Sequence, residues 1–201
     1  MEAKSFSNVK FEDFRWLNEP QEWSLNGSTL HMTTDNETNF WQKTYWENFD
    51  CHSGHVYGID IKDDFTFQIC IEANVNYLYD QAGLMIYIDE QHWLTTSMEY
   101  NEEQAVMNCV LTNGGSDWSQ SMGVFNGHPG KIWIRLTRTK DVVCVKYSTD
   151  NKTWHLLRLC PFPKAQKYFV GPMSSTPKRK GLKVKFSGLS IVPPAQDILA
   201  D

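Results

Sequence analysis

The feature that most constrains this chain is a two-residue alternation of apolar and other side chains, which recurs along most of the sequence. Successive side chains of a β-strand point to opposite faces, so the alternation predicts strands with one face in a core. In 65–75, Phe67 and Ile69 share one side, and Gln68 and Cys70 share the other. Runs of this kind lie at 30–34, 65–75, 81–88, 93–100, 105–112, 131–139, 142–149, 169–171 and 182–192. Turn-forming residues separate them, which predicts about ten or more short strands and no amphipathic helix.

The length of 201 residues fits a single domain, which we expect to span 1–201 without a linker or a repeat. A chain built from short strands folds as a sandwich or a barrel. The fold predicted here is all-β, with two antiparallel sheets packed as a sandwich. Pro193 and Pro194 follow the last strand-like run. Because proline cannot donate to a strand ladder, we expect 193–201 to form a loose tail.

Charge, hydropathy and cysteine spacing limit the partners of the chain. Its formal net charge is −5, whereas a nucleic-acid-binding protein needs a positive field, so no nucleic acid partner is expected. No apolar run approaches the ~18 residues that cross a bilayer, and the first residues lack the apolar stretch of a secretory signal. We therefore predict a cytoplasmic protein without a membrane partner. Five cysteines without Cys-x-x-Cys spacing and scattered histidines predict no disulfide framework, no metal and no other cofactor.

The alternation also predicts which side chains leave the core. If Leu84, Ile86, Leu94, Met98, Ile132 and Ile134 point inward, the opposite face carries Gln81, Met85, Tyr87, Trp93, Thr95, Ser97, Glu99, Trp133 and Arg135. Large aromatic side chains beside hydrogen-bonding groups favour a ligand surface. Alternatively, loops fold over this face and bury it. The sequence is consistent with both hypotheses.

Several motifs resemble those of one small family. The run Asp-Gln-Ala-Gly-Leu-Met occupies 80–85 and is followed by Trp93 and Glu99. Other matching segments are Arg15, Trp16 and Trp23 near the start, 39–44, Thr112 with Ser-Asp-Trp-Ser at 116–119, and 147–150 with Trp154 and Arg158. Together they resemble the regulation-of-enolase family of domains of unknown function, over nearly the whole chain. The chain departs from the family pattern at Asn39, Thr95 and Ser97, where the family usually has Asp, Lys and Gly.

The resemblance implies a concanavalin A-like jelly-roll sandwich, the fold of many lectins and glucanases. It also implies a non-catalytic, cytoplasmic interaction protein that is connected with carbon metabolism. A glycolytic enzyme such as enolase is the partner that this resemblance predicts. Because a shared fold does not by itself confer function, two other hypotheses stand beside this one.

The first alternative is a carbohydrate-binding module that uses the aromatic and polar sheet face. Aromatic rings pack against the apolar faces of sugars, while amide and charged groups bind the hydroxyls. The candidate ligand-binding residues are Gln81, Tyr87, Trp93, Glu99, Trp133 and Arg135 on the sheet face, with Trp41, Asp117 and Trp118 in loops.

The second alternative is a glycoside hydrolase. A retaining enzyme needs two carboxyl groups ~5–5.5 Å apart, and the Glu-x-Asp-x-Glu run of related glucanases does not occur here. Glu72, Glu99 and Asp117 would have to converge from different strands to supply such a pair. The leading prediction is therefore a protein that is not an enzyme and has no catalytic residues. Asp80, just before a strand-like run, is predicted to cap a turn.

Overall fold

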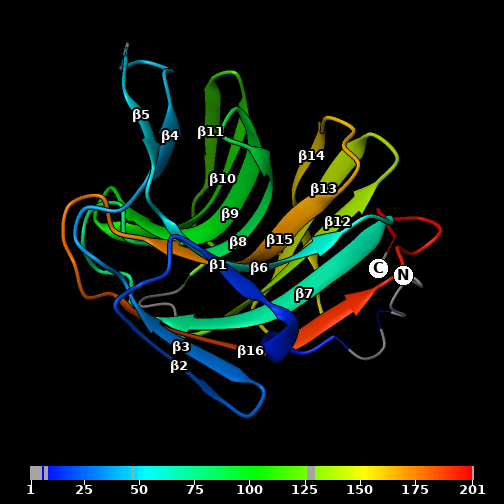
Figure 1. The fold of residues 1–201 in the computed structure, drawn as a ribbon, viewed down its shortest axis with the longest axis horizontal. Helices are drawn as coiled ribbons and strands as arrows, with labels where there is room; N and C mark the ends of the chain where they lie inside the picture. Colours follow the sequence, from blue (N-terminus) through cyan, green and yellow to red (C-terminus); the bar gives the residue numbers. More distant parts are fainter. Residues whose placement is uncertain (1–5, 7–8, 47, 126–129, 201) are drawn as a thin grey trace.

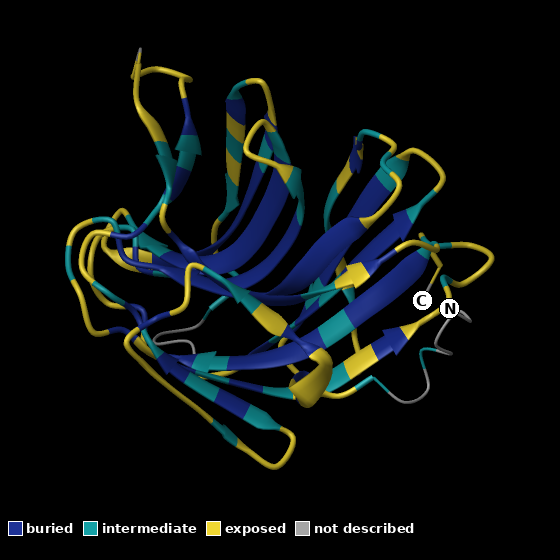
Figure 2. Ribbon diagram, in the orientation of Figure 1, coloured by how far each residue is buried: buried dark blue, intermediate teal, exposed yellow. Residues whose placement is uncertain are grey.

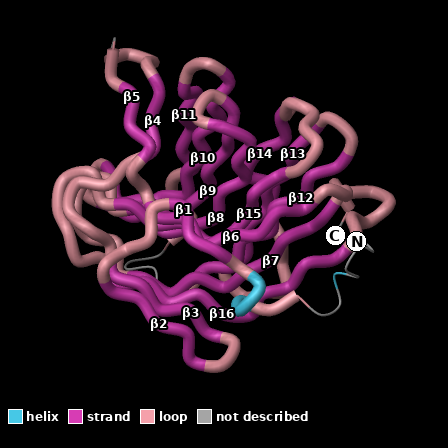
Figure 3. The backbone as a smooth tube through the Cα atoms, viewed as in Figure 1, coloured by secondary structure: helices cyan, strands magenta, loops and turns pink. Residues whose placement is uncertain are grey.

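The structure, a computed structural model, describes residues 6, 9–46, 48–125 and 130–200. Within this part of the chain, 3₁₀ structure occurs at Phe6 and in the short helix Phe11–Asp13, and the remainder consists of strands, turns and loops (Figure 3). The all-β prediction is confirmed. None of the described helical structure is long and apolar enough to cross a membrane.

Two seven-stranded antiparallel sheets form the molecule (Figure 1). The first sheet contains, in spatial order, β1 (Arg15–Leu17), β6 (His55–Ile61), β15 (Tyr168–Ser175), β8 (Gln81–Asp89), β9 (His92–Asn101), β10 (Gln104–Asn113) and β11 (Ser116–Ser121). The second contains β14 (His155–Pro161), β13 (Val142–Ser148), β12 (Ile132–Thr139), β7 (Phe65–Ala73), β16 (Lys183–Val192), β3 (Thr29–Thr33) and β2 (Glu22–Asn26). A separate hairpin pairs β4 (Phe40–Gln42) with β5 (Asp50–His52). The predicted two-sheet sandwich is confirmed.

The main core lies between the two sheets and follows the alternation of the sequence. Phe67, Ile69 and Ile71 of β7 are fully buried there, opposite Leu84 and Ile86 of β8. Figure 2 shows the central strands of both sheets as almost continuously buried. Burial of each such side chain contributes about 1.5–3 kcal/mol, which makes this layer the main source of stability.

A second, smaller apolar cluster covers the other face of the first sheet. It joins Phe40 of β4 to Met85, Trp93, Val110 and Phe169 of four sheet strands. Trp93 is fully buried, and the centres of its ring and that of Phe40 lie 5.8 Å apart. The β4–β5 hairpin therefore packs on the sheet face that the sequence predicted to lie outside the core, and the face is partly covered.

The C-terminal segment returns to the second sheet. Lys146 of β13 is buried, and its Nζ donates hydrogen bonds to the carbonyl oxygens of Leu199 and Ala200, at 3.1 and 3.2 Å. Within the stretch expected to form a loose tail, Ile198, Leu199 and Ala200 thus contact the outer face of β13.

Candidate functional site

A cavity of about 640 Å³ lies between the β4–β5 hairpin and the outer face of the first sheet. We call it the hairpin cavity. The described residues that line it are Glu37, Asn39, Phe40, Trp41, Trp46, Phe49, Cys51, Tyr79, Gln81, Glu99, Val110, Trp118, Pro177 and Lys178. They come from the hairpin, from β8 to β11 and from three loops, so no single stretch of sequence forms the site.

A buried polar contact helps to fix the hairpin to the first sheet. The backbone N–H of Gln42 donates to Ser116 Oγ at 2.9 Å, and this oxygen lies 2.8 Å from Thr112 Oγ1. All three residues are buried. Trp41 of the hairpin meets Trp118 of β11 edge to face, with ring centres 6.3 Å apart. The hairpin thus forms an aromatic wall of the cavity beside β11.

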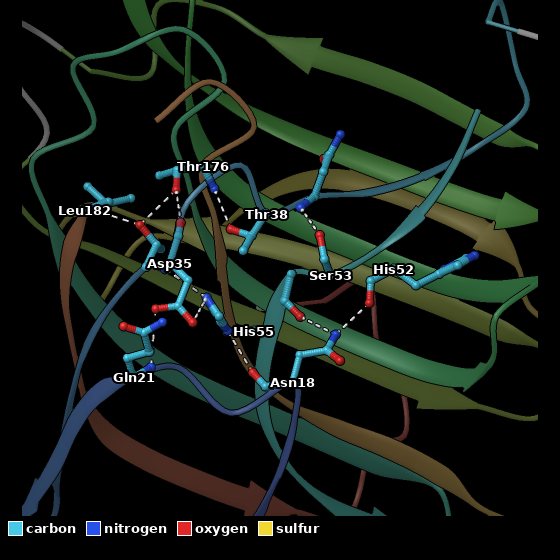
Figure 4. Close-up of polar contacts among 12 residues, drawn as sticks. Asn18, Gln21, Asp35, Thr38, His52, Ser53, His55, Thr176 and Leu182 are labelled. Atoms are coloured by element: carbon cyan, nitrogen blue, oxygen red, sulfur yellow. Dashed lines mark hydrogen bonds and ion pairs between the residues drawn. The ribbon is translucent and has the colours of Figure 1, made fainter. Parts of the chain in front are cut away.

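The loop before β4 is held by hydrogen bonds to β6 and to the end of β15 (Figure 4). The backbone N–H of Asp35 donates to His55 Nε2 at 3.1 Å, and that of Thr176 donates to Thr38 Oγ1. His55 Nδ1 lies 2.7 Å from Asn18 O. Because Nε2 accepts a hydrogen bond, the ring proton sits on Nδ1 and donates to that carbonyl. His55 therefore positions the cavity wall, and neither of its nitrogens is available to a metal.

The floor of the cavity contains a buried carboxyl group. Glu99 of β9 is 1% exposed. Asn108 Nδ2 donates to Glu99 Oε2 at 2.6 Å, and Gln120 Nε2 donates to Oε1 at 3.0 Å. Burial raises the pKa of Glu99 to about 7, although the two amide hydrogen bonds oppose this shift. The floor of the cavity thus holds an acid that is half protonated near neutral pH.

Aromatic side chains and one rim cation complete the walls. Trp118 packs against Trp41 and against Tyr79, whose ring centre is 6.2 Å away. The indole nitrogen of Trp118 is buried, and it has no hydrogen-bond partner within the described part of the chain. Lys178 lies on an exposed loop at the rim. The cavity therefore offers apolar ring faces together with a small number of hydrogen-bonding groups.

The rim loop that carries Lys178 is anchored from beneath. Its neighbour Arg179 pairs with the buried carboxylate of Asp80, through Nε at 2.9 Å and through Nη2. Asp80 Oδ2 also accepts the backbone N–H groups of Asn76 and Tyr77, both at 3.2 Å. Asp80 caps the turn before β8, as predicted, and it also ties that turn to the rim loop.

The structure brings four of the nine candidate residues together in the cavity. Gln81, Glu99, Trp41 and Trp118 line it. Tyr87 and Trp93 share the same sheet face but belong to the apolar cluster under Phe40, and Trp93 Nε1 donates to the backbone oxygen of Glu90. They support the floor and do not line the cavity.

Trp133 and Arg135 do not belong to this face. Both lie on β12 in the second sheet, where the prediction had placed them beside Trp93 and Glu99. Arg135 stacks on Trp154 at 3.8 Å, and Lys131 lies over the ring of Trp133 at 4.8 Å. The prediction failed because alternation tells which face of its own strand a side chain occupies, and not which sheet the strand joins.

Asp117 is also outside the cavity. It lies on the opposite face of β11 from Trp118, and its Oδ2 pairs with Arg158 Nη2 at 2.7 Å. Glu72 lies on β7 of the second sheet and pairs with Lys185 at 3.1 Å. The hydrolase hypothesis requires Glu72, Glu99 and Asp117 to converge, and the structure shows that these three carboxyl groups lie apart. Trp41, Asp117 and Trp118 were expected in loops but lie in β4 and β11.

The sequence did contain a signal for one site residue that was missed. Asn108 lies between Met107 and Cys109 in the middle of an apolar strand, and it is fully buried. In the pairing of β9 with β10, Asn108 lies opposite Ser97, two residues before Glu99, and so on the same sheet face as Glu99. A buried asparagine in such a run needs a polar partner, which is a sign of a site. Within the described part of the chain, no group of three or more His, Cys, Asp or Glu side chains is placed to hold a metal ion.

Comparison with known proteins identifies the family. Residues 16–194 match the family described as "Protein of unknown function (DUF1349)". The chain is 40% identical to "Regulation of enolase protein 1" of Saccharomyces cerevisiae over 194 residues, which is 96% of each protein. It also resembles the crystal structure of a functionally unknown protein from Saccharomyces cerevisiae, with a TM-score of 0.89, 40% identity and coverage of 93% of this chain and 100% of that one.

More distant structures share the fold. A GH43 protein, BlXynB, from Bacillus licheniformis has a TM-score of 0.66 and 15% identity, over 90% of this chain and 36% of that one. This likeness concerns the sandwich alone. Because the family match takes in nearly all of the sequence, the chain belongs to the DUF1349 family, as its motifs predicted.

Proposed function

We propose that this protein is a non-catalytic regulatory protein that binds a carbohydrate in the hairpin cavity. The observation that carries the proposal is the combination, in one cavity, of indole and phenol rings with a buried, amide-bound carboxyl group. The volume of the hairpin cavity falls within the range of roughly 300–1,000 Å³ that is usual for small-ligand sites. Sugar rings have apolar faces and hydroxyl edges, so they require this pairing of surfaces.

The polar groups of the cavity suit binding better than hydrolysis. Both oxygens of Glu99 accept hydrogen bonds from amides, and Asp117 and Glu72 are paired with cations elsewhere. Glu37, the other carboxylate among the described lining residues, is exposed on a loop. Retaining hydrolysis needs a second carboxyl group positioned across the scissile bond from the first. We therefore propose recognition without turnover.

Calorimetry with cellotetraose, maltotetraose and xylotetraose tests the proposal. We expect one of these sugars to bind, and the Trp118→Ala variant to weaken binding by roughly 30-fold, the usual effect of removing a buried aromatic anchor. Trp133→Ala, which changes a comparable side chain on the second sheet, should leave the Kd unchanged. Reducing-sugar assays on the same oligosaccharides should show no release of product. If none of the three sugars binds at millimolar concentration, the carbohydrate proposal fails.

A second candidate function is supported by the relative named for regulation of enolase, which is 40% identical over nearly the whole chain. We propose that the protein acts in the cytoplasm and has a glycolytic enzyme, with enolase first, as partner. Capture from cytosol on the immobilised chain, followed by sedimentation with purified enolase, tests this proposal. If the purified enzyme sediments independently of the chain, enolase is not a direct partner.

A further inference from the structure

The two oxygens of Glu99 face different neighbours, and this difference fixes where a proton can reside. Oε2 lies 2.6 Å from Asn108 Nδ2. The orientation of the Asn108 amide is set by Ser97, whose backbone N–H and hydroxyl both donate to Asn108 Oδ1, at 3.1 and 2.7 Å. A backbone N–H is always a donor, so the amide oxygen must face Ser97 and the amide nitrogen must face Glu99. Oε2 is therefore held as an acceptor.

The other oxygen, Oε1, is the one that can carry a hydrogen. Its described partner is Gln120 Nε2, at 3.0 Å. The Gln120 side chain is half-buried at the edge strand β11, and either end of its amide can turn toward Glu99. A proton on Oε1 is thus compatible with the fixed Asn108 amide, whereas a proton directed from Oε2 toward Asn108 would meet an N–H group.

Few charged groups face Glu99. On β8 its neighbour in the ladder is the neutral Gln81, and Asp80, one residue earlier, is paired with Arg179. The titratable or charged side chains that line the same cavity from other elements are Glu37, Cys51, Tyr79 and Lys178. Among the ion pairs of the described residues, none includes Glu99. A buried carboxyl group without a paired cation is stabilised in its neutral form.

We propose that Glu99 recognises the ligand as a neutral carboxylic acid, whose O–H donates from Oε1 to an ether or hydroxyl oxygen of an uncharged polyol. This inference rests on the proposed carbohydrate site, and it adds that Glu99 must be protonated for the ligand to bind. An O–H group that donates requires an acceptor oxygen, so the cavity selects an oxygen-rich ligand without a cationic group. When Glu99 ionises, this donor is lost and the carboxylate repels ligand oxygens.

The test measures the Kd of wild type for the tightest of the three tetrasaccharides at about pH 6 and about pH 8.5. With a pKa of about 7 for Glu99, and binding only to the neutral form, the Kd should rise about 30-fold between the two values. The Glu99→Gln variant presents an amide oxygen to Asn108 and an N–H₂ group in place of the O–H. We expect it to bind with nearly the same Kd at both pH values. Glu37→Gln, which neutralises the rim carboxylate, should keep the wild-type dependence.

The outcomes separate the two proposals. Binding with the same Kd at both pH values, or a pH dependence that survives in Glu99→Gln, overturns the role of the Glu99 proton and leaves the carbohydrate site standing. No binding at either pH overturns both. A titration of the Glu99 side-chain carboxyl carbon by NMR in the free protein supplies a measurement that needs no ligand. A midpoint near the ordinary value of 4.5 for glutamate would also overturn the inference.

Discussion

At the scale of single residues, Gly83 shows how closely the strands beneath the cavity approach. It lies in the Asp-Gln-Ala-Gly-Leu-Met motif, and its φ angle is ordinary, so conformational freedom does not explain the glycine. A Cβ atom at this position would lie 1.9 Å from the backbone oxygen of Thr96 and 2.5 Å from Ser97 Cα. Both contacts are with backbone, which cannot turn aside as a flexible side chain can. Ser97 in turn orients Asn108, so the absence of a side chain at Gly83 maintains the cavity floor.

We predict that Gly83→Ala destabilises the protein by about 1–3 kcal/mol, because β8 and β9 must separate to admit the methyl group. The free energy of unfolding from urea titration measures this effect. Gly130→Ala is the matched control, because a Cβ atom at Gly130 meets nothing within 4 Å and should change stability by less than about 0.5 kcal/mol. Equal stabilities of the two variants would show that β8 and β9 have room for a methyl group.

The raised pKa of Glu99 also makes stability depend on pH. In the unfolded chain this acid has its ordinary pKa of 4.5, and in the folded chain its pKa is about 7. Below pH 4.5 both states hold the proton. As the pH rises, the unfolded chain ionises first, so the folded state loses stability until the pH passes about 7, a loss of roughly 3 kcal/mol. The difference in unfolding free energy between wild type and Glu99→Gln should therefore shift by that amount between about pH 4 and pH 8. A difference that stays constant over this range would mean that Glu99 ionises normally in the folded protein.

At the scale of elements, an apolar cluster and a buried hydrogen bond attach the β4–β5 hairpin to the first sheet. We predict that Ser116→Ala leaves the buried Gln42 N–H without its acceptor, at a cost of about 1–3 kcal/mol, and loosens the hairpin. Hydrogen exchange at the Gln42 amide should accelerate more than exchange in β9. Ser28→Ala, an exposed position in the turn between β2 and β3, is the control and should alter neither rate. Unchanged exchange at Gln42 in Ser116→Ala would indicate that the aromatic wall alone holds the hairpin.

The elements also show which parts of this fold could be predicted. Strands such as β7 and β9 alternate over their whole length, so their extent and inward face follow from side-chain geometry alone. By contrast, β11 is Ser-Asp-Trp-Ser-Gln-Ser and has a single apolar residue, so nothing distinguishes it from a loop. The seven-residue strand β6 is almost continuously buried and also lacks alternation. Such strands are specified by their partners in the sheet, which sequence patterns do not reveal.

The same reasoning explains the partial success at the site. The alternation placed Gln81 and Glu99 on one face because β8 and β9 are joined by a short hairpin. It could not separate Trp133 from that face, because the assignment of β12 to the second sheet depends on its pairing with β7. The hairpin cavity itself requires contact between Gln42 and Ser116, which are 74 residues apart in the sequence. Contacts of this length follow from the complete topology and not from local pattern.

At the scale of the whole molecule, the two faces of the sandwich have different coverings. The first sheet is covered by the β4–β5 hairpin, which leaves a cavity between them. The second sheet is partly covered by the C-terminal segment, which meets the buried ammonium of Lys146 and the thiol of Cys144. An ammonium group removed from water requires acceptors, and here backbone carbonyls supply them. Residues 198–200 are thus part of the folded unit.

We predict that removing residues 196–201 lowers the free energy of unfolding by roughly 1–3 kcal/mol, because Lys146 loses acceptors in a site from which water had been excluded. Thermal and urea unfolding measure the loss. Lys146→Met provides the matched background, since a methionine has a similar length and needs no acceptor. In that background the same truncation should cost much less, and the difference between the two costs is the coupling between the segment and the ammonium. If the truncation costs the same in both backgrounds, the segment stabilises the sandwich by covering apolar surface, and the hydrogen bonds to Lys146 contribute nothing measurable.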